Sequence, residues 1–284
     1  MNTPITKKKG LAIFCLARGY KNWEIYKYFK LCIRNIFILH TLKRNVIRYD
    51  LIIFHEGNIH KSHQMFIKVF SLTRSIEFIS VVDEFNLPPK FTQPEGVLNL
   101  GYVFMCRFNY LSVWNYLSNY ETVMRIDDDV FLVEIDTQYS GGIFDYAFIS
   151  NEAHEPTNVS LHAYLASKGK EDLYDHKFPY TNFYITKPEY WLRRDVQEFL
   201  ADIGDRQEGI NDRWGDATIL GIALKEFQTW SHTRLRTDVK YLHMSHLSIV
   251  TNGLNVTLYS RISSRFPMIA RIMRLALRFW RRLL

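Results

Sequence analysis

The sequence has few cysteines, no long apolar run and no sign of a boundary between domains. The three cysteines, Cys15, Cys32 and Cys106, are widely spaced and match no metal-binding pattern, so we expect reduced, mostly buried thiols. No uncharged stretch approaches the ~20 residues that a membrane-spanning helix needs. The basic start runs into only a short apolar segment, residues 11–17, so we expect no signal peptide and a cytoplasmic protein. No repeat, low-complexity tract or linker divides the chain, and we expect one domain.

The remaining composition is that of a globular protein with a sizeable core. The 284 residues are 47% hydrophobic and 23% charged, with 36 Lys and Arg against 29 Asp and Glu, a net charge of +7. Part of the basic excess is local, at the start of the chain and beyond residue 261. A basic segment can bind nucleic acid, anionic lipid or a phosphorylated substrate, so charge alone leaves these partners open.

Three consecutive carboxylates, Asp127, Asp128 and Asp129, follow one apolar run and precede another. In an extended chain alternate side chains point to opposite faces, so Asp127 and Asp129 should point one way and Asp128 the other. Two like charges on one face repel, and Mg²⁺ or Mn²⁺ would relieve the repulsion and bridge to phosphates. We interpret the run as a metal site at the carboxyl end of a sheet strand, where open α/β sheets bind ligands. The alternative is a solvated acidic turn.

The chain alternates between strand and helix patterns. In the first half, strands are expected at 10–17, 49–58, 76–82 and 121–126, and helices at 22–42, 59–71 and 100–118. This alternation predicts an α/β fold with a Rossmann-like, mostly parallel central sheet flanked by helices. In the second half, strands are expected at 144–152 and 178–186, and helices at 158–168, 188–203 and from near residue 216 onward.

Three further residues are candidates for a ligand site. Asp216 follows a tight turn at residues 213–215 and is either the N-cap of a helix or an acid that orients an acceptor. His243 ends an apolar, strand-like segment and is either structural or a third metal ligand opposite Asp129. Arg18 ends the first strand and is either a surface arginine or a contact for a diphosphate.

Six segments, in order over most of residues 11–250, resemble the fungal glycolipid 2-α-mannosyltransferase family. They are LARG (16–19), GYVFMCRFN (101–109), RIDDDV (125–130), TNFYI (181–185), DRWGDA (212–217) and KYLHM (240–244). The resemblance implies a GT-A-like single domain over residues 1–260, with a nucleotide-binding half at about 10–132 and an acceptor half at about 133–260. It also implies a retaining α-1,2-mannosyltransferase that uses GDP-mannose with Mn²⁺ or Mg²⁺.

The resemblance also implies roles for individual residues. Asp129, Asp127 and His243 become the metal ligands, although the family has Glu-Pro-Asp where this chain has three aspartates. Asp216 matches an acid near the reacting centre. Tyr184 takes the position of the family's proposed catalytic Glu, so in place of a double displacement we expect a same-face route, in which the leaving diphosphate takes the acceptor proton. The candidate nucleotide-binding residues are Arg18, Glu56, Tyr102, Arg107 and Asp127.

Residues 261–284 form a separate, basic amphipathic pattern. Arg271, Arg274, Arg278 and Arg281 recur at helical spacing, and apolar residues cover much of the remaining surface. The alternatives are an ordinary helix docked on the core and, over residues 264–284, a helix lying in the plane of an anionic membrane. A polar face of arginine alone favours the membrane. We therefore expect a peripheral enzyme on the inner face of the cell membrane, beside a lipid-linked acceptor, with no nucleic acid partner.

Two other functions are weighed against this one. Asp127 and Asp129 after an apolar strand also fit the nucleophile motif of haloacid-dehalogenase-like phosphatases, with Asp216 as a late acid, but that nucleophile normally follows the first strand. A non-enzymatic protein that binds a membrane or nucleic acid through its basic tail would not need the clustered acids. The function favoured is a glycosyltransferase that moves a hexose from a sugar nucleotide to a hydroxyl of a glycan or lipid-linked glycan.

Overall fold

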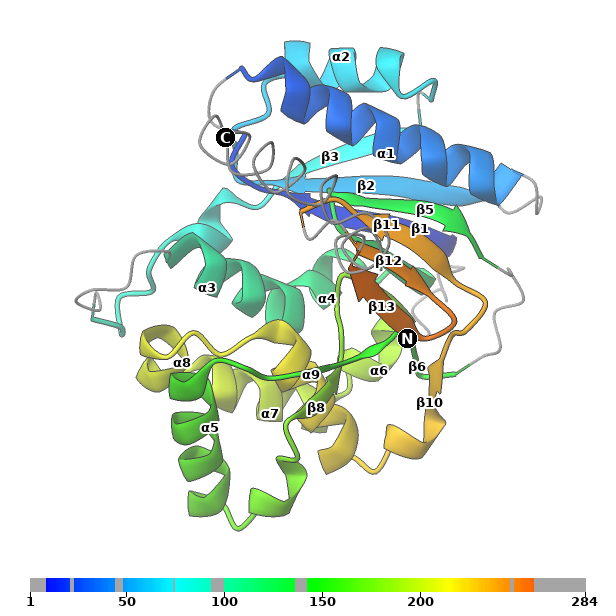
Figure 1. Cartoon of the computed structure of the whole chain (residues 1–284). Helices are drawn as coiled ribbons and strands as arrows, with labels where there is room; N and C mark the ends of the chain where they lie inside the picture. Colours follow the sequence, from blue (N-terminus) through cyan, green and yellow to red (C-terminus); the bar gives the residue numbers. More distant parts are fainter. Residues whose placement is uncertain are drawn as a thin grey trace, which may run out of the picture.

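Helices cover both faces of a central sheet in this protein (Figure 1). The computed structural model describes residues 9–20, 23–43, 48–73, 75–92, 100–135, 142–245 and 248–257. The amphipathic helix expected at 264–284 lies outside the described residues. In the part of the chain that is described, no helix is both long enough and apolar enough to cross a bilayer.

The central sheet has seven strands in the order β10-β6-β9-β4-β1-β2-β3. Their bounds, in that order, are Thr233–Leu235, Phe144–Tyr146, Phe183–Thr186, Tyr120–Ile126, Lys9–Ala17, Tyr49–His55 and Ile76–Ser80. The pairs β1–β2, β2–β3, β1–β4 and β6–β10 are parallel, while β9 runs antiparallel to both of its neighbours, β4 and β6. The predicted α/β fold with a mostly parallel central sheet is confirmed.

The side chains of β1 alternate between two cores. Ala12 and Phe14 belong to one core, and Ile13 and Cys15 belong to the other, as the period of a strand requires. The first core is covered by α4 (Val113–Tyr116), α5 (Glu155–Ser167), α7 (Arg194–Gly204) and α9 (Asp216–Glu226). The second is covered by α1 (Ile25–Lys43) and α2 (Lys61–Phe70), which lie together on the opposite side of the sheet (Figure 1).

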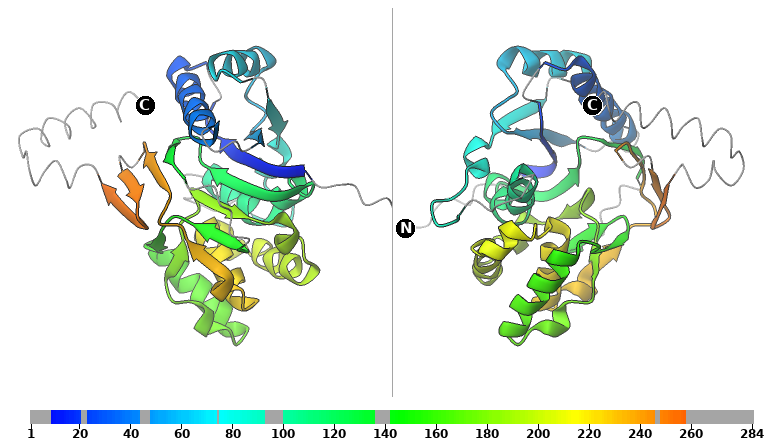
Figure 2. Two further views of the ribbon diagram at one scale, coloured as in Figure 1. Left: turned by 90° about the vertical axis from the view of Figure 1, so that its right-hand side faces the viewer. Right: turned by 60° about the vertical axis from the view of Figure 1, so that its left-hand side comes forward.

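A second, antiparallel sheet was not predicted from the sequence, because its strands are only four or five residues long. Its order is β13-β12-β11-β5, with bounds Leu254–Thr257, Ser248–Thr251, Lys240–His243 and Val130–Glu134. Figure 2 shows the β11–β13 strands to one side of the central sheet. Strand β5 begins directly after the three aspartates, and its register pairs Val130 with His243. The sheet therefore brings the end of β11 beside the aspartates.

Four predicted elements are interrupted in the structure. The strand expected at 144–152 is β6 followed by β7 (Ile149–Asn151), and that at 178–186 is β8 (Lys177–Pro179) followed by β9. The helix expected at 100–118 is α3 (Leu100–Arg107), a π-helical turn (Phe108–Ser112) and α4, and that at 188–203 is α6 (Pro188–Trp191) and α7, with α8 (Gln207–Asn211) following. Strands β7 and β8 pair with each other in a separate small sheet. Their departure from the central sheet brings residues 150–152 and 180–182 to the site described next.

Candidate active site

A cleft of about 390 Å³ lies at the carboxyl ends of β1 and β4. Its walls come from the β4–β5 turn, helix α3, the end of β7, the residues that precede β9, the start of α9 and the end of β11. Six of the residues singled out in the sequence line it together: Arg18, Tyr102, Asp127, Asp129, Asp216 and His243. The carboxyl ends of parallel strands are where open α/β sheets bind ligands, so the location agrees with the expectation from the sequence.

The three aspartates lie in a turn rather than in an extended strand. The first residue of β5 donates its amide to the Asp127 carbonyl oxygen at 3.1 Å, which closes the turn between β4 and β5. Asp127 and Asp129 line the cleft, whereas Asp128 accepts a hydrogen bond from the Tyr20 hydroxyl at 3.0 Å and pairs with Lys30 at 3.3 Å. The predicted division of the three carboxylates is therefore confirmed, although a turn produces it.

Arg125, near the end of β4, joins two carboxylates of the cleft. Its Nε donates to Asp127 Oδ1 at 2.8 Å, and its Nη1 forms a close ion pair with Asp216 Oδ2. The Arg125 side chain is only 5% exposed, so water screens these pairs weakly. Burial raises the pKa of Asp127 to about 6; the Arg125 guanidinium opposes this shift, and the charges of Asp129 and Asp216 add to it. The arginine thus lets several acids share one cleft.

Asp129 and His243 form a second pair. His243 Nε2 lies 3.5 Å from Asp129 Oδ2, and the Ser245 amide donates to the same carboxylate oxygen at 3.3 Å. Asn182 Nδ2 lies 3.2 Å from His243 Nδ1, and the Tyr241 hydroxyl donates to Asn182 Oδ1 at 2.7 Å. This chain of contacts holds the imidazole beside the carboxylate.

An imidazole nitrogen and a carboxylate oxygen so close together are suitable ligands for Mn²⁺ or Mg²⁺. Over the described ranges, no group of three or more His, Cys, Asp or Glu side chains is arranged to hold a metal ion. Asp127, the third ligand expected from the sequence, is instead paired with Arg125. The residues therefore fit a divalent cation that would take two ligands, Asp129 and His243, from the protein.

Helix α9 brings Asp216 to the cleft because it packs closely against β8. A Cβ atom at Gly221 of α9 would lie 2.3 Å from the Phe178 ring, so only glycine permits this approach. The N-cap of α9 is Gly215, and no side chain makes a capping hydrogen bond. Asp216 is thus the first helical residue and not an N-cap, and its carboxylate meets Arg125.

The candidate nucleotide contacts lie on another wall of the cleft. Arg18 lines this wall, and its Nε pairs with Glu56 Oε1 at 3.2 Å. Glu56 does not itself line the cleft and instead fixes the direction of Arg18. Tyr102 also lines the wall, and the Arg213 guanidinium lies 4.9 Å from the centroid of its ring. A planar guanidinium beside an aromatic ring offers charge and stacking area to a nucleotide.

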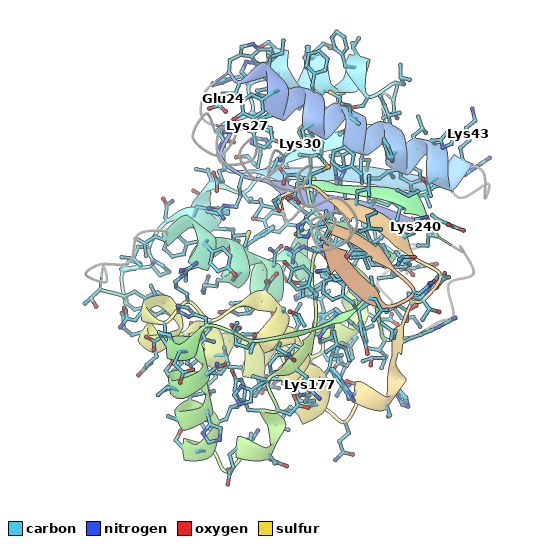
Figure 3. The ribbon with its side chains drawn as sticks, viewed as in Figure 1. Glu24, Lys27, Lys30, Lys43, Lys177 and Lys240 are labelled. Atoms are coloured by element: carbon cyan, nitrogen blue, oxygen red, sulfur yellow. The ribbon has the colours of Figure 1, made fainter. Side chains whose placement is uncertain are left out.

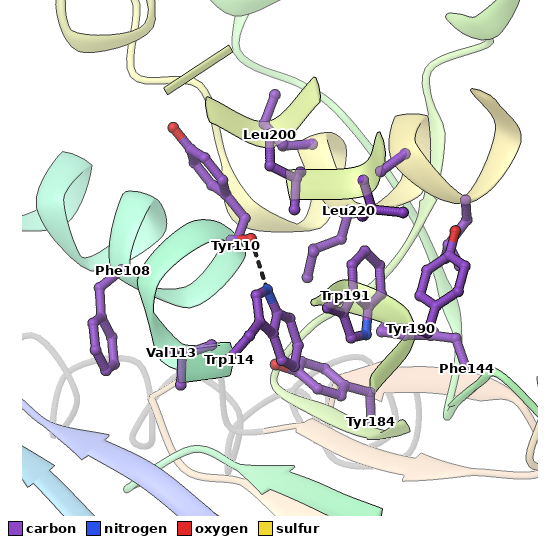
Figure 4. Packing of buried hydrophobic residues seen from close by; sticks show 14 of the residues in the cluster. Phe108, Tyr110, Val113, Trp114, Phe144, Tyr184, Tyr190, Trp191, Leu200 and Leu220 are labelled. Carbon is purple, nitrogen blue, oxygen red and sulfur yellow. Dashed lines mark hydrogen bonds between the residues drawn. The ribbon is translucent and has the colours of Figure 1, made fainter. Parts of the chain in front are cut away.

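Two further candidates from the sequence, Arg107 and Tyr184, also lie outside the cleft. Arg107 donates from Nε to the carbonyl oxygen of Gly204, at the end of α7, at 3.3 Å. Tyr184 is fully buried, with its ring stacked on Phe144 at 4.9 Å between centroids and packed near Trp114 (Figure 4). Tyr184 lies opposite Arg125 in the β4–β9 register, and its ring centroid is 5.9 Å from the Arg125 guanidinium, but its side chain is buried in the helical core and does not line the cleft. Neither Arg107 nor Tyr184 is part of the proposed site.

Glu152, Arg125 and Asn182 line the cleft and were not singled out in the sequence. Glu152 accepts hydrogen bonds from the Thr218 hydroxyl at 2.7 Å and from the His154 amide at 2.9 Å. In the sequence, Glu152 could be recognised only as an acid at the end of the strand expected at 144–152. Arg125 and Asn182 lie inside segments that resemble the fungal family. The roles that the resemblance implies in those segments belong to Asp127, Asp129 and Tyr184.

No protein-family model matches the sequence, and no curated protein matches it. Many solved structures resemble it in fold, among them two fungal enzymes. With core-mannan synthase A from Aspergillus fumigatus, in a Mn/GDP form, the TM-score is 0.68 and the identity 14%, over 86% of this chain and 77% of that one. With a mannosyltransferase from S. cerevisiae in complex with GDP, the TM-score is 0.65 and the identity 16%, over 84% and 71%. The predicted structural resemblance to fungal mannosyltransferases is confirmed, and the chain has their GT-A fold.

Proposed function

We propose that this protein is a metal-dependent glycosyltransferase. It moves a hexose, mannose from GDP-mannose, to a hydroxyl of a glycan or lipid-linked glycan. One observation supports this proposal most strongly. The Asp129–His243 pair and the Asp216 carboxylate, which Arg125 holds, line one cleft of a GT-A fold. The GDP bound in both fungal structures supports the choice of nucleotide.

Asp129 and His243 would hold Mn²⁺ or Mg²⁺, with Asp127 close by. When bound, the cation neutralises the negative charge that develops on the departing diphosphate. The protein's own part is to fix its two ligands: Asn182 contacts the far nitrogen of the His243 imidazole, and the Ser245 amide donates to the Asp129 carboxylate. The Mn/GDP form of core-mannan synthase A supports this pairing of metal and nucleotide.

Arg18 and Tyr102 bind the nucleotide part of the donor. The guanidinium of Arg18 presents planar N–H donors, which suit the oxygens of a diphosphate. Its pairing with Glu56 at 3.2 Å limits its directions before the substrate arrives, so less entropy is lost on binding. Tyr102, with Arg213 over its ring, provides a flat surface on the same wall.

The transfer retains the anomeric configuration and forms an α-1,2 linkage. The bond from the anomeric carbon to the diphosphate oxygen breaks, and the acceptor oxygen bonds to that carbon from the same face. The acceptor proton passes to the departing diphosphate oxygen, so no enzymic nucleophile is needed. This route agrees with the burial of Tyr184, where the fungal family has a carboxylate.

Asp216 orients the acceptor hydroxyl and faces the positive charge that develops on the sugar. Its ion pair with Arg125 fixes the position of its carboxylate. Glu152 lies on the same side of the cleft, tied to α9 through Thr218. A second carboxylate there suits the other hydroxyls of a glycan acceptor.

The proposed acceptor is lipid-linked, and the enzyme is proposed to be cytoplasmic and peripheral on the inner face of the cell membrane. The arginines and apolar residues of 264–284 suit an anionic lipid surface. The haloacid-dehalogenase-like alternative has less support. Its nucleophile follows the first strand, whereas Asp127 follows β4 and is paired with Arg125.

The test is binding of GDP-, UDP- and ADP-linked sugars, with and without Mn²⁺, to the full chain and to Asp129→Ala. We expect Mn²⁺-dependent binding of GDP-mannose that Asp129→Ala abolishes. Asp128→Ala is the matched control, because its carboxylate points away to Tyr20 and Lys30, and it should bind like the wild type. Absence of metal-dependent binding of every sugar nucleotide by the wild type would refute the proposal.

A further inference from the structure

Helices α1 and α2 form a layer whose outer side is unusually apolar. Nine of the 17 exposed large hydrophobic side chains among the described residues lie on this layer or at its ends. They are Trp23, Ile25, Tyr26, Phe29, Ile33, Met65, Val69, Phe70 and Leu72, and we call them the α1–α2 apolar face. Scattered exposed hydrophobics are ordinary on protein surfaces, but a gathering of this kind marks an interaction site.

The α1–α2 apolar face is continuous across the two helices. Phe66 of α2 lies 5.3 Å from Trp23, 5.5 Å from Phe29 and 4.3 Å from Phe70, measured between ring centroids. Phe29 is also 5.7 Å from Phe70. The aromatic rings therefore connect the start of α1 to the end of α2 in one surface.

This surface is not needed for the core beneath it. Helix α1 already buries a separate set of side chains against the sheet: Tyr28, Leu31, Cys32, Ile38 and Leu42. Phe29 and Ile33, four residues apart, share the opposite side of the helix and are 38% and 45% exposed. Exposed apolar side chains that gather on one side of a helix layer mark an interaction site, so a partner is expected for the outer side.

The charged side chains of α1 and α2 are all basic. Neither α1 nor α2 contains Asp or Glu. Their lysines are Lys27, Lys30, Lys43, Lys61 and Lys68, and Figure 3 shows the first three along α1. The acids nearest in contact are Glu24, which precedes α1 and pairs with Lys27 at 2.8 Å, and Asp128, which pairs with Lys30. An apolar surface on helices whose charged side chains are basic is complementary to anionic lipid.

We propose that the α1–α2 apolar face rests on an anionic lipid bilayer. Trp and Tyr favour the interfacial zone of a membrane, and the aliphatic and Phe side chains favour the acyl boundary just below it. A second copy of the chain fits less well. In a two-fold contact both copies would present lysines, and neither α1 nor α2 has an acid to pair with them.

The face also adjoins the candidate active site. Lys30 of α1 and Tyr20 both contact Asp128, the middle residue of the aspartate turn. Lys27 donates to the carbonyl of Gly19, next to Arg18 of the cleft wall. A bilayer on α1 and α2 would thus lie near the nucleotide side of the cleft. The idea that this contact orients a lipid-linked acceptor rests on the proposed function. The contact with the bilayer itself does not.

The first test is vesicle co-sedimentation of the full chain with phosphatidylcholine vesicles, with and without phosphatidylserine. Ile33→Glu/Met65→Glu places two acids on the face and should weaken binding to the anionic vesicles roughly tenfold or more. The matched control, Val133→Glu/Val159→Glu, changes two exposed residues on other elements, β5 and α5, and should bind within about twofold of the wild type. Both variants should keep the wild-type unfolding midpoint.

A second measurement separates this face from residues 264–284, which include Trp280. Brominated lipids should quench tryptophan fluorescence in the full chain, and Trp23→Phe should remove part of that quenching, because Trp23 is 47% exposed while Trp114, Trp191 and Trp214 are buried. Unchanged quenching in Trp23→Phe, or wild-type vesicle binding by Ile33→Glu/Met65→Glu, would overturn the proposal. The proposal would also be overturned if the wild type were a dimer, Ile33→Glu/Met65→Glu were a monomer, and neither protein bound vesicles. Sugar-nucleotide binding measured without lipid should be the same in these variants as in the wild type. A failure of the proposed function would therefore appear in that assay and not in the vesicle assay.

Discussion

The Arg125 guanidinium and the Asp216 carboxylate form an ion pair that ties the end of β4 to the first turn of α9. The two residues are 91 positions apart in the sequence, and both side chains are largely buried. The same guanidinium holds Asp127, so one cation organises acids from two walls of the cleft.

Arg125→Ala should destabilise the fold. Removing one partner of a buried ion pair leaves uncompensated charge and costs about 3–5 kcal/mol. Because the Asp127 side chain is 30% exposed, we expect a loss near the lower end, about 3 kcal/mol, measured by urea unfolding. Arg125→Lys keeps the charge but loses the two-armed geometry, so it should recover part of the stability. An unchanged midpoint in Arg125→Ala would show that the pair contributes nothing.

Asp216→Asn should separate catalysis from donor binding. The amide keeps the shape but not the charge that faces the developing positive sugar, so turnover should fall about 10²-fold or more. Donor affinity should change little, because the nucleotide contacts come from other walls. Asp212→Asn, a nearby acid outside the cleft wall, is the control. A parallel loss of donor affinity in Asp216→Asn would argue against this division of roles.

Asn182→Ala should weaken the metal site without removing a ligand. Its amide contacts His243 Nδ1 and accepts from the Tyr241 hydroxyl, so the imidazole would lose its orienting partner. Loss of such an outer contact lowers metal affinity about 10–100-fold. Mn²⁺ titration in the presence of GDP, followed by electron paramagnetic resonance, measures this affinity directly. Asn211→Ala, an exposed amide on α8, should titrate like the wild type.

The sequence was sufficient for the alternating first half of the fold and for most of the cleft. Phe14 and Ile13 lie on two buried faces of β1, and a strand buried on both faces is readable without a structure as a short continuous apolar run. Motif segments also located Asp127, Asp129, Asp216 and His243 correctly in one cleft.

The remainder depends on tertiary contacts that local patterns do not encode. The apolar spacing at 22–42 predicts a helix, but it does not tell that Phe29 and Ile33 face outward. Tyr184 occupies a motif position, yet packing against Phe144 and Trp114 buries it beneath Arg125 and out of the cleft. Glu152 reaches the cleft because β7 leaves the central sheet to pair with β8, a break that the continuous strand pattern at 144–152 conceals.

Gly221→Ala tests whether close helix packing positions the catalytic acid. The new Cβ would lie 2.3 Å from the Phe178 ring, so α9 or β8 must shift. Overpacking of this kind costs about 1–3 kcal/mol, and a shift of α9 would move Asp216 away from Arg125. We therefore expect a lower unfolding midpoint together with lower turnover. Gly10→Ala is the control, because its Cβ would have no atom within 4 Å.

The double variant Gly221→Ala/Phe178→Leu then distinguishes steric displacement from a simple loss of glycine. A smaller side chain at 178 makes room for the new methyl group, so stability and turnover should both recover in part, and the two substitutions should be non-additive. If Phe178→Leu only adds to the damage, α9 is not held in place by this contact, and another interaction, such as that between Thr218 and Glu152, positions Asp216.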